Sequence, residues 1–496
     1  MPATPVEGAQ GASAYYFNGD GRADMALGIP GENVGGVARA GAVQVINGSR
    51  TGLTASGSQT WSQASPGVQG VARTGDSFGT SNTSGDFDGD GYADLAIGVP
   101  GGGFGAVAVL YGSSHGLSTR DQLFHSSELG HKDVWGGSLV AGDFDGDGRA
   151  DLAIGADPAS PSSHAQKGAL TVLRGGADGL TRRGAVRFTK DSPGIAGTSE
   201  IGDAFGYHLA AGDVTGDGRD DLAAATRQRS GEGDGVYFLP GSAQGITATG
   251  SKLYTAETPG LTPADTTLAA LGSDVALDDF DADGHDDLAI GDHNAGPPGS
   301  TECATRGACP GAVLVLPGAT RGPVAEAEQV WYQDAPGIPG SSEGGDGFGW
   351  SLATGDLNGD GRSDLSVGVV GEDIGSPAVL DGGGLNLIYG SPTGLTGAGA
   401  QMWTQRSAGI KGAAEEADFF GRGLRIANFG RGAAADLAVY SDGEDLAAAT
   451  EAGAVNVLYG SNHRVTARDQ FWSQNSPGIA GRAQSGDFFG AMSRAH

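Results

Sequence analysis

The chain has 496 residues, 93 of them glycine, and a formal net charge of −30. This charge excludes nucleic acid as a partner, because its phosphates would be repelled. No apolar stretch approaches the roughly 18 residues that insert into a membrane. Glycine at this frequency without a G-X-Y period excludes collagen and indicates many turns between short strands.

An acidic nonapeptide recurs along the whole chain. Five full copies read D-F-D-G-D-G-Y-A-D at Asp86–Asp94, D-F-D-G-D-G-R-A-D at Asp143–Asp151, D-V-T-G-D-G-R-D-D at Asp213–Asp221, D-F-D-A-D-G-H-D-D at Asp279–Asp287 and D-L-N-G-D-G-R-S-D at Asp356–Asp364. Two weaker copies, Tyr16–Asp24 and Asn428–Asp436, bracket them. The seven copies begin 57 to 77 residues apart. Such a period indicates one repeat array and not a series of separate domains.

Each repeat is predicted to form four short strands. The first follows G-D-x-F-G, which is complete at Gly75–Gly79, Gly202–Gly206 and Gly345–Gly349, and Trp135 replaces the phenylalanine in unit three. The second follows the acidic segment, at Leu95–Val99, Leu152–Ala156, Leu222–Thr226, Leu288–Gly291 and Leu365–Val369. The third reads G-A-V-x-V-L-Y-G or similar, at Gly105–Gly112, Gly168–Gly175, Gly311–Gly318, Gly384–Gly390 and Gly453–Gly460. The fourth ends in W-S-Q-A-S-P-G-V-Q-G or a relative, at Trp61–Gly70, Phe188–Gly197, Trp331–Gly340, Trp403–Gly412 and Trp472–Gly481.

Four short strands with no helical period describe one blade of a β-propeller. We therefore expect an all-β, seven-bladed β-propeller with four antiparallel strands per blade. It would be a single domain over residues 1–496, with blades at about 8–70, 71–130, 131–199, 200–262, 263–340, 341–413 and 414–483. We expect a monomer.

The C-terminal strand is predicted to close the ring. Unit one has no Phe-Gly before its acidic segment, whereas G-D-F-F-G occurs at Gly486–Gly490, near the other end. Residues 484–496 would then supply the inner strand of the first blade and leave no open sheet edge. The alternative is a truncated eighth repeat.

The combination of Phe-Gly, D-x-D-x-D-G-x-x-D-L and G-A-V-x-V resembles the FG-GAP repeat of the integrin α-subunit head and of related bacterial secreted proteins. The resemblance covers essentially the whole chain. It implies a seven-bladed β-propeller whose acidic loops bind Ca²⁺ and whose opposite face carries ligand recognition.

The acidic loops also predict calcium from their own chemistry. Alternate residues of a tight loop point to one side, so the three acidic side chains of D-x-D-x-D can converge on one cation. The ninth residue closes the shell, the seventh contributes its carbonyl, and hard oxygen donors in this number favour Ca²⁺. The expected ligands are Asp86, Asp88, Asp90, Tyr92 and Asp94; Asp143, Asp145, Asp147, Arg149 and Asp151; Asp213, Thr215, Asp217, Arg219 and Asp221; Asp279, Asp281, Asp283, His285 and Asp287; Asp356, Asn358, Asp360, Arg362 and Asp364.

The copies are not equivalent as ligand sets. Asn358 keeps an oxygen at the third position, Thr215 is a weaker neutral ligand there, and unit one offers only the weaker set Asn18, Asp20 and Asp24. Unit seven retains Asp436 alone, so we expect no Ca²⁺ in that loop. The cofactor is therefore Ca²⁺, with about four to six ions. Any one loop could be an Asp/Gly turn without metal, but the repetition favours metal.

Cys303 and Cys309 are the only cysteines. We expect them to form a disulfide across a small surface loop, which implies an oxidising, extracellular compartment; two free thiols are the alternative. The first 20 residues have neither a basic start nor an apolar core. They therefore contain no signal peptide, and we expect a mature secreted chain.

No catalytic motif is present. G-S-S-H-G at Gly112–Gly116 matches a nucleophile elbow, but the same turn recurs as G-S-R-T-G and G-S-P-T-G, so it is structural. His208 occupies a core strand position. Trp61, Trp331, Trp403 and Trp472 lie at equivalent positions and are expected to pack in the core, with sugar stacking as the alternative.

The loops between second and third strands vary most between units, and loops on a rigid scaffold commonly carry binding sites. They span Gly28–Ala40, Asp157–Lys167, Thr226–Gly235, Asp292–Pro310, Val370–Gly383 and Ser441–Gly453. We therefore expect a secreted, calcium-stabilised recognition or adhesion module that binds a protein or glycan through these loops. The alternatives are a lectin with sites between blades and an extracellular hydrolase or lyase with a pocket on that face.

Overall fold

The computed structural model describes residues 14–101, 103–156, 167–227, 235–261, 268, 270–296, 309–327, 329–375, 377–430 and 432–491. In these ranges the chain forms 27 strands and two short 3-10 turns, η1 (Ser126–Leu129) and η2 (Ala325–Ala327). None of its described helices is long and apolar enough to cross a membrane. The expectation of an all-β protein is confirmed.

The strands pair antiparallel with their neighbours in sequence. One sheet has three strands, β1 (Met25–Ile29), β2 (Ala42–Asn47) and β3 (Thr54–Trp61). The four-stranded sheets are β4 (Asn82–Gly85), β5 (Asp94–Val99), β6 (Ala106–Leu110) and β7 (Asp121–Phe124); β16 (Val275–Asp278), β17 (Asp287–Asp292), β18 (Ala312–Leu316) and β19 (Gln329–Trp331); β20 (Phe348–Gly355), β21 (Asp364–Val369), β22 (Gly384–Ser391) and β23 (Gly394–Trp403); β24 (Gly423–Ala427), β25 (Asp436–Ser441), β26 (Ala454–Tyr459) and β27 (Thr466–Trp472).

The remaining sheet has eight strands and consists of two four-stranded halves. These are β8 (Ser138–Gly142), β9 (Asp151–Ala156), β10 (Ala169–Arg174) and β11 (Thr181–Phe188), then β12 (Ala204–Gly212), β13 (Asp221–Arg227), β14 (Gly235–Leu239) and β15 (Lys252–Thr255). The halves join through one residue pair between β12 and β9, Phe205 and Ala156. Each half therefore follows the four-strand plan of the repeat.

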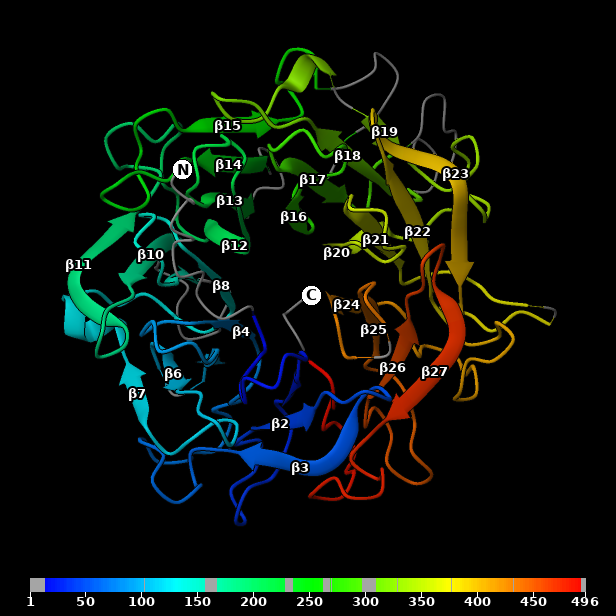
Figure 1. The fold of residues 1–496 in the computed structure, drawn as a ribbon, viewed down its shortest axis with the longest axis horizontal. Coiled ribbons are helices and arrows are strands. Elements are labelled where there is room, and N and C mark those ends of the chain that lie inside the picture. Colours follow the sequence, from blue (N-terminus) through cyan, green and yellow to red (C-terminus); the bar gives the residue numbers. More distant parts are fainter. Residues whose placement is uncertain are drawn as a thin grey trace, which may run out of the picture.

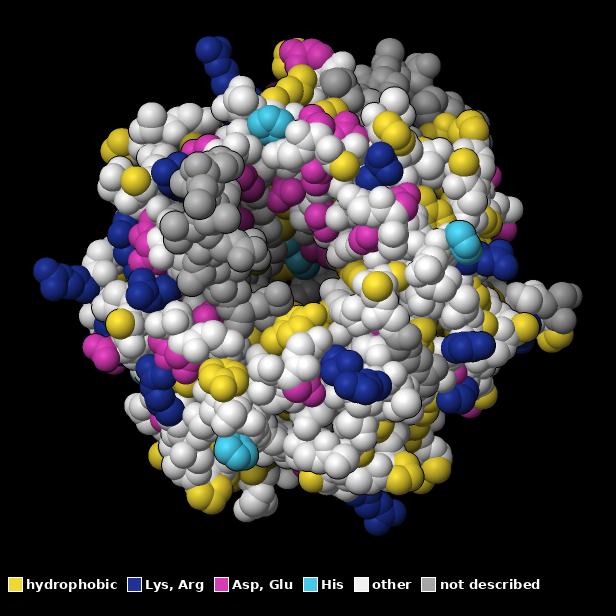
Figure 2. Space-filling model, viewed as in Figure 1, with side chains coloured by type: hydrophobic (Ala, Val, Ile, Leu, Met, Phe, Trp, Pro, Cys, Tyr) yellow, Lys and Arg dark blue, Asp and Glu magenta, His cyan; other side chains and the backbone are white. Residues whose placement is uncertain are grey.

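Figure 1 shows the sheets following one another around a central axis, with β4, β8, β12, β16, β20 and β24 nearest the centre and β3, β7, β11, β15 and β27 at the rim. Figure 2 shows that this face is hollowed at its middle and that acidic side chains line part of the hollow. The middle strands are buried on both faces, as β5 and β6 are at every residue, whereas β11 is half exposed. This gradient explains why the second and third strands read as continuous apolar runs.

Hydrophobic clusters form between adjacent four-stranded units. In one of them Val107 of β6 packs with Ile154 of β9, together with Phe87 and Trp135. The aromatic residue of each Phe-Gly pair is a buried anchor in such clusters: Phe78, Trp135, Phe205, Phe348 and Phe420 are at most 1% exposed. Because apolar area removed from water is the main favourable term in folding, each unit depends on its neighbours for its core.

The second and third strands start and end within two residues of their predicted positions. The fourth strand differs in its end: β3 stops at Trp61, and the residues that follow form turns with the hydrogen bonds Ser65 N to Ser62 O (3.0 Å) and Val68 N to Ser65 O (3.1 Å). The W-S-Q-A-S-P-G segment is thus a connector between sheets.

The segment near Ala491 lies beside the first sheet. Gly28 of β1 donates to the carbonyl of Ala491, and Gly490 donates to the carbonyl of Gly28, both over 2.9 Å. Phe489 is fully buried in a cluster with Met25 of β1 and Tyr440 of β25. The expected pairing of the G-D-F-F-G segment with the first unit is therefore present over the described residues.

One backbone hydrogen bond recurs between successive units. The amide of the eighth loop residue donates to the carbonyl of the first loop residue in the preceding unit. The seven bonds are Ala93 to Tyr16 (3.2 Å), Ala150 to Asp86 (2.9 Å), Asp220 to Asp143 (3.1 Å), Asp286 to Asp213 (3.1 Å), Ser363 to Asp279 (3.1 Å), Ala435 to Asp356 (2.8 Å) and Ala23 to Asn428 (3.0 Å). The last of these joins the first unit to the final one.

Candidate metal centres

The acidic loops lie at one end of the sheets. Six of them connect the first strand of a four-stranded unit to the second, as Asp86–Asp94 does between β4 and β5, and Tyr16–Asp24 leads directly into β1. The loops between second and third strands leave the sheets from the opposite end, because neighbouring strands run antiparallel. The fold thus separates the repeated acidic loops from the variable loops.

The loop of unit two is held by its own carboxylates. Asp86 accepts amide hydrogen bonds from Gly89 (2.7 Å) and Asp90 (3.1 Å) with Oδ1 and from Gly91 (3.0 Å) with Oδ2. Gly91 has a φ of 89°, a left-handed conformation that glycine adopts without strain and that the sharp turn requires. The oxygens of Asp86, Asp88 and Asp94 lie within 4.8 Å of one another, and all three residues are buried.

Two further loops bring three carboxylates together. Oxygens of Asp143, Asp145 and Asp147 lie within 4.8 Å of one another, and the same holds for Asp279, Asp281 and Asp283. In unit two Asp90 lies outside the cluster, although it is exposed like Asp147 and Asp283 and likewise accepts the amide two residues on (Tyr92 N to Asp90 Oδ1, 2.9 Å). In units four and six Thr215 and Asn358 interrupt the carboxylate set.

The ninth loop residue has a structural role in all seven units. Its Oδ1 accepts the amide that ends the third strand: Asp24 from Gly48, Asp94 from Gly112, Asp151 from Gly175, Asp221 from Gly241, Asp287 from Gly318, Asp364 from Gly390 and Asp436 from Gly460, over 2.7–3.1 Å. All seven are at most 4% exposed. Burial raises the pKa of Asp94 to about 8 and that of Asp151 to about 7.

An asparagine at the third position turns its amide nitrogen toward the carboxylates. Asn358 Oδ1 accepts the amide of Asp360 (2.8 Å), and this fixes its Nδ2 near Asp360 Oδ2 (3.3 Å) and Asp364 Oδ1 (3.4 Å). Asn18 is arranged alike: Oδ1 accepts from Asp20 (2.8 Å) and Nδ2 donates to Asp24 (3.4 Å). The side-chain Oδ1 that was expected to be a calcium ligand thus accepts a backbone hydrogen bond within the loop.

The loop of unit seven is held without acidic side chains at its first positions. Asn428 donates its side-chain amide to the carbonyls of Gly432 (3.1 Å) and Ala433 (3.3 Å). Asp436 remains and accepts from Phe429 (2.9 Å). A side-chain amide thus closes this turn.

Arginines compensate part of the negative charge. Arg120 pairs with Asp88, Arg174 with Asp145 (3.2 Å), and Arg219 with Asp217 (2.9 Å). Arg149 contacts two loops, with Nη1 at Asp147 Oδ2 of its own loop (3.2 Å) and Nε at the carbonyl of Asp88 in the preceding loop (3.4 Å). His285 Nδ1 lies 3.0 Å from the carbonyl of Val214 in the preceding loop.

The donor sets fit a divalent cation. They consist of carboxylate and carbonyl oxygens, the hard donors that Ca²⁺ takes in flexible geometry. The Oδ2 atoms of Asp24 and Asp151 are buried and have no hydrogen-bond partner among the described residues. Buried polar atoms without a partner are costly, and a bound cation would satisfy these.

Several other sequence predictions have an outcome. His208 on β12 is 5% exposed, with Nδ1 at 3.4 Å from Asp274, so its core position is confirmed. The G-S-S-H-G turn is structural: Ser113 Oγ donates to Gly116 O (2.7 Å), as Ser242 does to Gly245 (2.7 Å). The four tryptophans are partly buried and pack against hydrophobic clusters from their edges.

Some predicted features lie outside the described residues. Cys303 is one, so the Cys303–Cys309 disulfide stays a prediction; Cys309 is 5% exposed, and its amide donates to Asn294 Oδ1 (3.0 Å). Most of the loops at 157–167 and 226–235 are likewise not described.

The FG-GAP repeat family matches residues 78–110, 135–173, 205–239 and 348–385. Three of these ranges begin at the phenylalanine of a Phe-Gly pair and one at Trp135. Rat phosphatidylinositol-glycan-specific phospholipase D is 33% identical over 164 residues, which are 32% of this chain and 19% of that protein. Drosophila integrin alpha-PS2 is 31% identical over 228 residues, 44% of this chain and 15% of that protein. The chain thus spans less than a quarter of the length of these relatives.

Among solved structures, a Bacillus licheniformis rhamnogalacturonan lyase is 15% identical, with a TM-score of 0.36, over 86% of this chain and 65% of that one. Such a score supports no conclusion about fold or function. The antiparallel sheets, the buried aromatic-glycine anchors and the oxygen-lined loops define an all-β repeat protein. The chain contains four matches to the FG-GAP repeat and is similar to an integrin α subunit over part of its length.

Proposed function

We propose that the chain is a secreted recognition or adhesion module, built as a closed seven-bladed β-propeller and stabilised by Ca²⁺. The observation that carries this proposal is the separation of two loop sets: repeated acidic loops at one end of the sheets and loops of variable sequence at the other. Repeated loops serve the scaffold in every unit, whereas variable loops on a rigid scaffold can serve a ligand.

Two contacts support closure of the ring. Ala23 donates to Asn428, which repeats between the first and last units the bond found between all other neighbours. The pairing of Gly28 with Ala491 gives the three-stranded first sheet a segment in the place of its inner strand. Under this proposal the blades keep the boundaries predicted from the sequence, and residues 484–496 close the first blade.

The calcium ligands are proposed to be the acidic residues of units two to six, with a weaker set in unit one. The loops with three converging carboxylates, in units two, three and five, are the strongest sites. Unit six is weaker because Asn358 directs an N–H group inward. The ions would hold loop carboxylates that otherwise repel one another.

The partner is proposed to be an extracellular protein or glycan, bound through the loops opposite the calcium loops. Integrin α subunits, which the chain resembles, are adhesion proteins, and this similarity supports the same class of role here. The experiment is a screen of purified full chain against glycan and extracellular-protein arrays in Ca²⁺.

Replacing residues Asn294–Cys309 with a short Gly-Ser linker should weaken the bound partner and leave calcium content unchanged. The matched variant Asp145→Asn should lower calcium content and leave the partner bound as long as the protein stays folded. The reverse pattern, or turnover of a substrate abolished by single changes on the variable-loop face, would replace the binding proposal.

A further inference from the structure

A buried glutamine–glutamate contact recurs between successive units on the variable-loop face. The glutamine follows the fourth strand of one unit, and the glutamate lies in the loop after the second strand of the next. The contacts are Gln474 Nε2 to Glu32 (2.6 Å), Gln333 Nε2 to Glu372 (2.8 Å) and Gln405 Nε2 to Glu444 (2.7 Å). The three glutamines are at most 4% exposed. A glutamate carboxyl group is therefore the usual partner of this side-chain amide.

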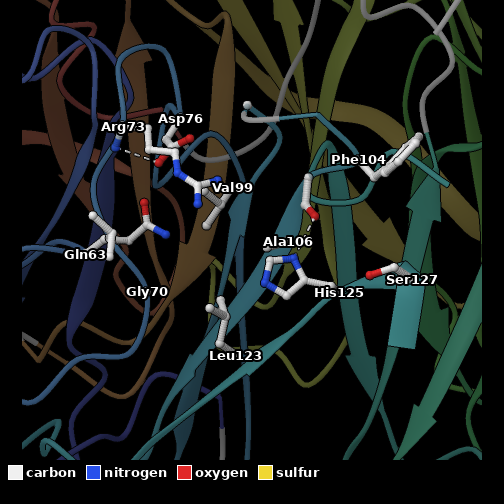
Figure 3. A pocket seen from close by; sticks show the side chains of 13 residues that line it. Gln63, Gly70, Arg73, Asp76, Val99, Phe104, Ala106, Leu123, His125 and Ser127 are labelled. Carbon is white, nitrogen blue, oxygen red and sulfur yellow. Dashed lines mark hydrogen bonds between the residues drawn. The ribbon is translucent and has the colours of Figure 1, made fainter. Parts of the chain in front are cut away.

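Gln63, the fourth copy of this glutamine, has no such partner. The segment that reads I-P-G-E at Ile29–Glu32 reads V-P-G-G at Val99–Gly102, so glycine stands where the glutamate would be. Gln63 makes no hydrogen bond with its side chain among the described residues, and its Oε1 is buried. A pocket of about 330 Å³ lies here, lined by Gln63, Arg73 and His125 (Figure 3).

The junction at Gln63 carries a positive side chain where the equivalent junctions carry acidic ones or a glutamine. Arg73 stands ten residues after Gln63, and the residues ten after the other glutamines are Glu343, Glu415 and Gln484. The four positions are structurally equivalent, because each amide donates to the aspartate three residues on, over 2.6–2.8 Å. At this junction alone among the four, a carboxylate is lost and a guanidinium is gained.

The opposite wall of the pocket is also distinct. His125 follows β7 directly, at the position that Ser62, Thr404 and Ser473 occupy after other fourth strands. Its Nδ1 lies 3.3 Å from the carbonyl of Gly105, and Figure 3 shows its other ring nitrogen turned toward the Gln63 side. The apolar side chains Val71 and Phe104 are 70% and 39% exposed at the edge.

We propose that this pocket binds a uronic acid unit, with the sugar carboxylate on Gln63 and Arg73. The proposal deepens the recognition function above and rests on it. The ligand carboxylate would take the place that Glu32 takes on Gln474. The buried Asp76 would repel the sugar carboxylate, and Arg73 offsets this repulsion with a positive charge that the equivalent positions at the other three junctions do not carry.

A sugar fits this pocket better than an acidic side chain of a peptide. Polar side chains stand at both ends, Gln63 and Arg73 on one wall and His125 and Ser127 on the other (Figure 3). A sugar ring carries hydroxyls as well as a carboxylate and presents a C–H face to Phe104. The volume is within the range of small-ligand pockets.

The test is calorimetric titration of the full chain in Ca²⁺ with galacturonate, glucuronate, galactose and N-acetyl-aspartate amide. We expect a uronate to bind at least about tenfold more tightly than galactose, because bonds between charged groups are the strong ones. Salt should weaken this binding. Arg73→Gln, which installs the residue found at Gln484, should lower uronate affinity at least about tenfold. The matched control Arg482→Gln, an exposed arginine at the junction with Glu32, should not.

Gln63→Leu should abolish uronate binding, because it removes the amide that is proposed to hold the sugar carboxylate, and a thermal melt checks that this variant folds. Equal binding of uronate and galactose, no uronate binding, or unchanged binding in Arg73→Gln would overturn the proposal. Preference for the aspartate amide would make the site a peptide site and would also overturn it. If uronates fail while an array still yields a partner, the pocket assignment falls and the recognition function stands.

Discussion

Gln405 donates its side-chain amide to the carboxylate of Glu444 over 2.7 Å, and the pair is buried between β23 and the loop after β25. Burial, with the nearby charge of Asp418, raises the pKa of Glu444 to about 8. Burial also raises the pKa of Asp418 to about 6. At neutral pH this contact therefore holds a proton that the unfolded chain would release.

We expect Glu444→Gln to reduce the pH dependence of stability. The folded pKa lies above the ordinary value of 4.5, so the folded state binds more protons between about 4.5 and 8. The stabilising contribution is complete below pH 4.5 and is lost as pH rises through 8. The other acidic groups facing Glu444 are Asp418, Glu415 and Asp445.

At pH 8 the variant should be more stable than the parent by roughly 1–2 kcal/mol, and at pH 5 the two should be similar. Urea unfolding at constant Ca²⁺ measures this, and Glu416→Gln, an exposed change in the neighbouring segment, is the control. If the free energies of unfolding of parent and variant differed by the same amount at pH 5 and pH 8, the contact would not be protonated as described.

Removal of calcium should lower the melting temperature. A site whose dissociation constant is a hundredth of the free Ca²⁺ adds about 2.7 kcal/mol to stability, and several sites add together. Asp145→Asn should lose about one ion of bound Ca²⁺, measured by equilibrium dialysis, because Asp145 converges with Asp143 and Asp147. Asp178→Asn, an exposed change in the same unit with the same loss of charge, should lose none. A melting curve unaffected by excess chelator would show that the loops are not calcium sites.

Asn358→Asp should strengthen the calcium site of unit six. Asn358 turns Nδ2 toward Asp364, and aspartate would put an oxygen there. We expect about tenfold tighter binding at this loop, since a direct charged ligand replaces a donor. Calcium titration by calorimetry measures it, and Asn428→Asp serves as the control because the loop of unit seven has no other carboxylate at its first positions. A gain of the same size in both variants would attribute the effect to net charge.

The contact between the last and first units should depend on Phe489. This side chain is fully buried with Met25 and Tyr440, so Phe489→Ala should cost about 3–5 kcal/mol. Phe488, its partly exposed neighbour, provides the matched change to alanine, which should cost much less. Chemical denaturation gives both values, and light scattering follows the aggregation expected from an opened edge. Equal small losses would mean that the 486–491 segment contributes little to the fold.

The strands and the acidic loops could be predicted from the sequence because their determinants are local. Runs such as Leu95–Val99 are buried on both faces and therefore apolar throughout, and Gly91 marks the turn that its φ requires. Because the acidic segment recurs at similar spacing, its two weaker copies could be recognised by comparison with the five full ones. The burial of His208 was predictable for the same reason.

The orientation of single groups could not be predicted. The inward Nδ2 of Asn358 depends on which amide its Oδ1 accepts, and the sequence does not contain that choice. The pocket at Gln63 was also missed, although one signal was present: Gly102 and Arg73 both depart from the residues found at their repeat positions. Only the contact between Gln474 and Glu32 reveals what that departure removes.

The first residue of an acidic loop can make hydrogen bonds both within its own loop and to the next unit. Asp143 shapes its own loop with its carboxylate, which accepts from Gly146 and Gly148 over 2.8 Å, and its carbonyl accepts from Asp220 in the next unit. An ion that draws the Asp143 carboxylate inward should therefore also move the Asp143 carbonyl, which accepts the hydrogen bond from the neighbouring loop. Calcium bound at one loop should therefore raise the calcium affinity of the next loop. This positive cooperativity would fill the sites over a narrow range of calcium concentration.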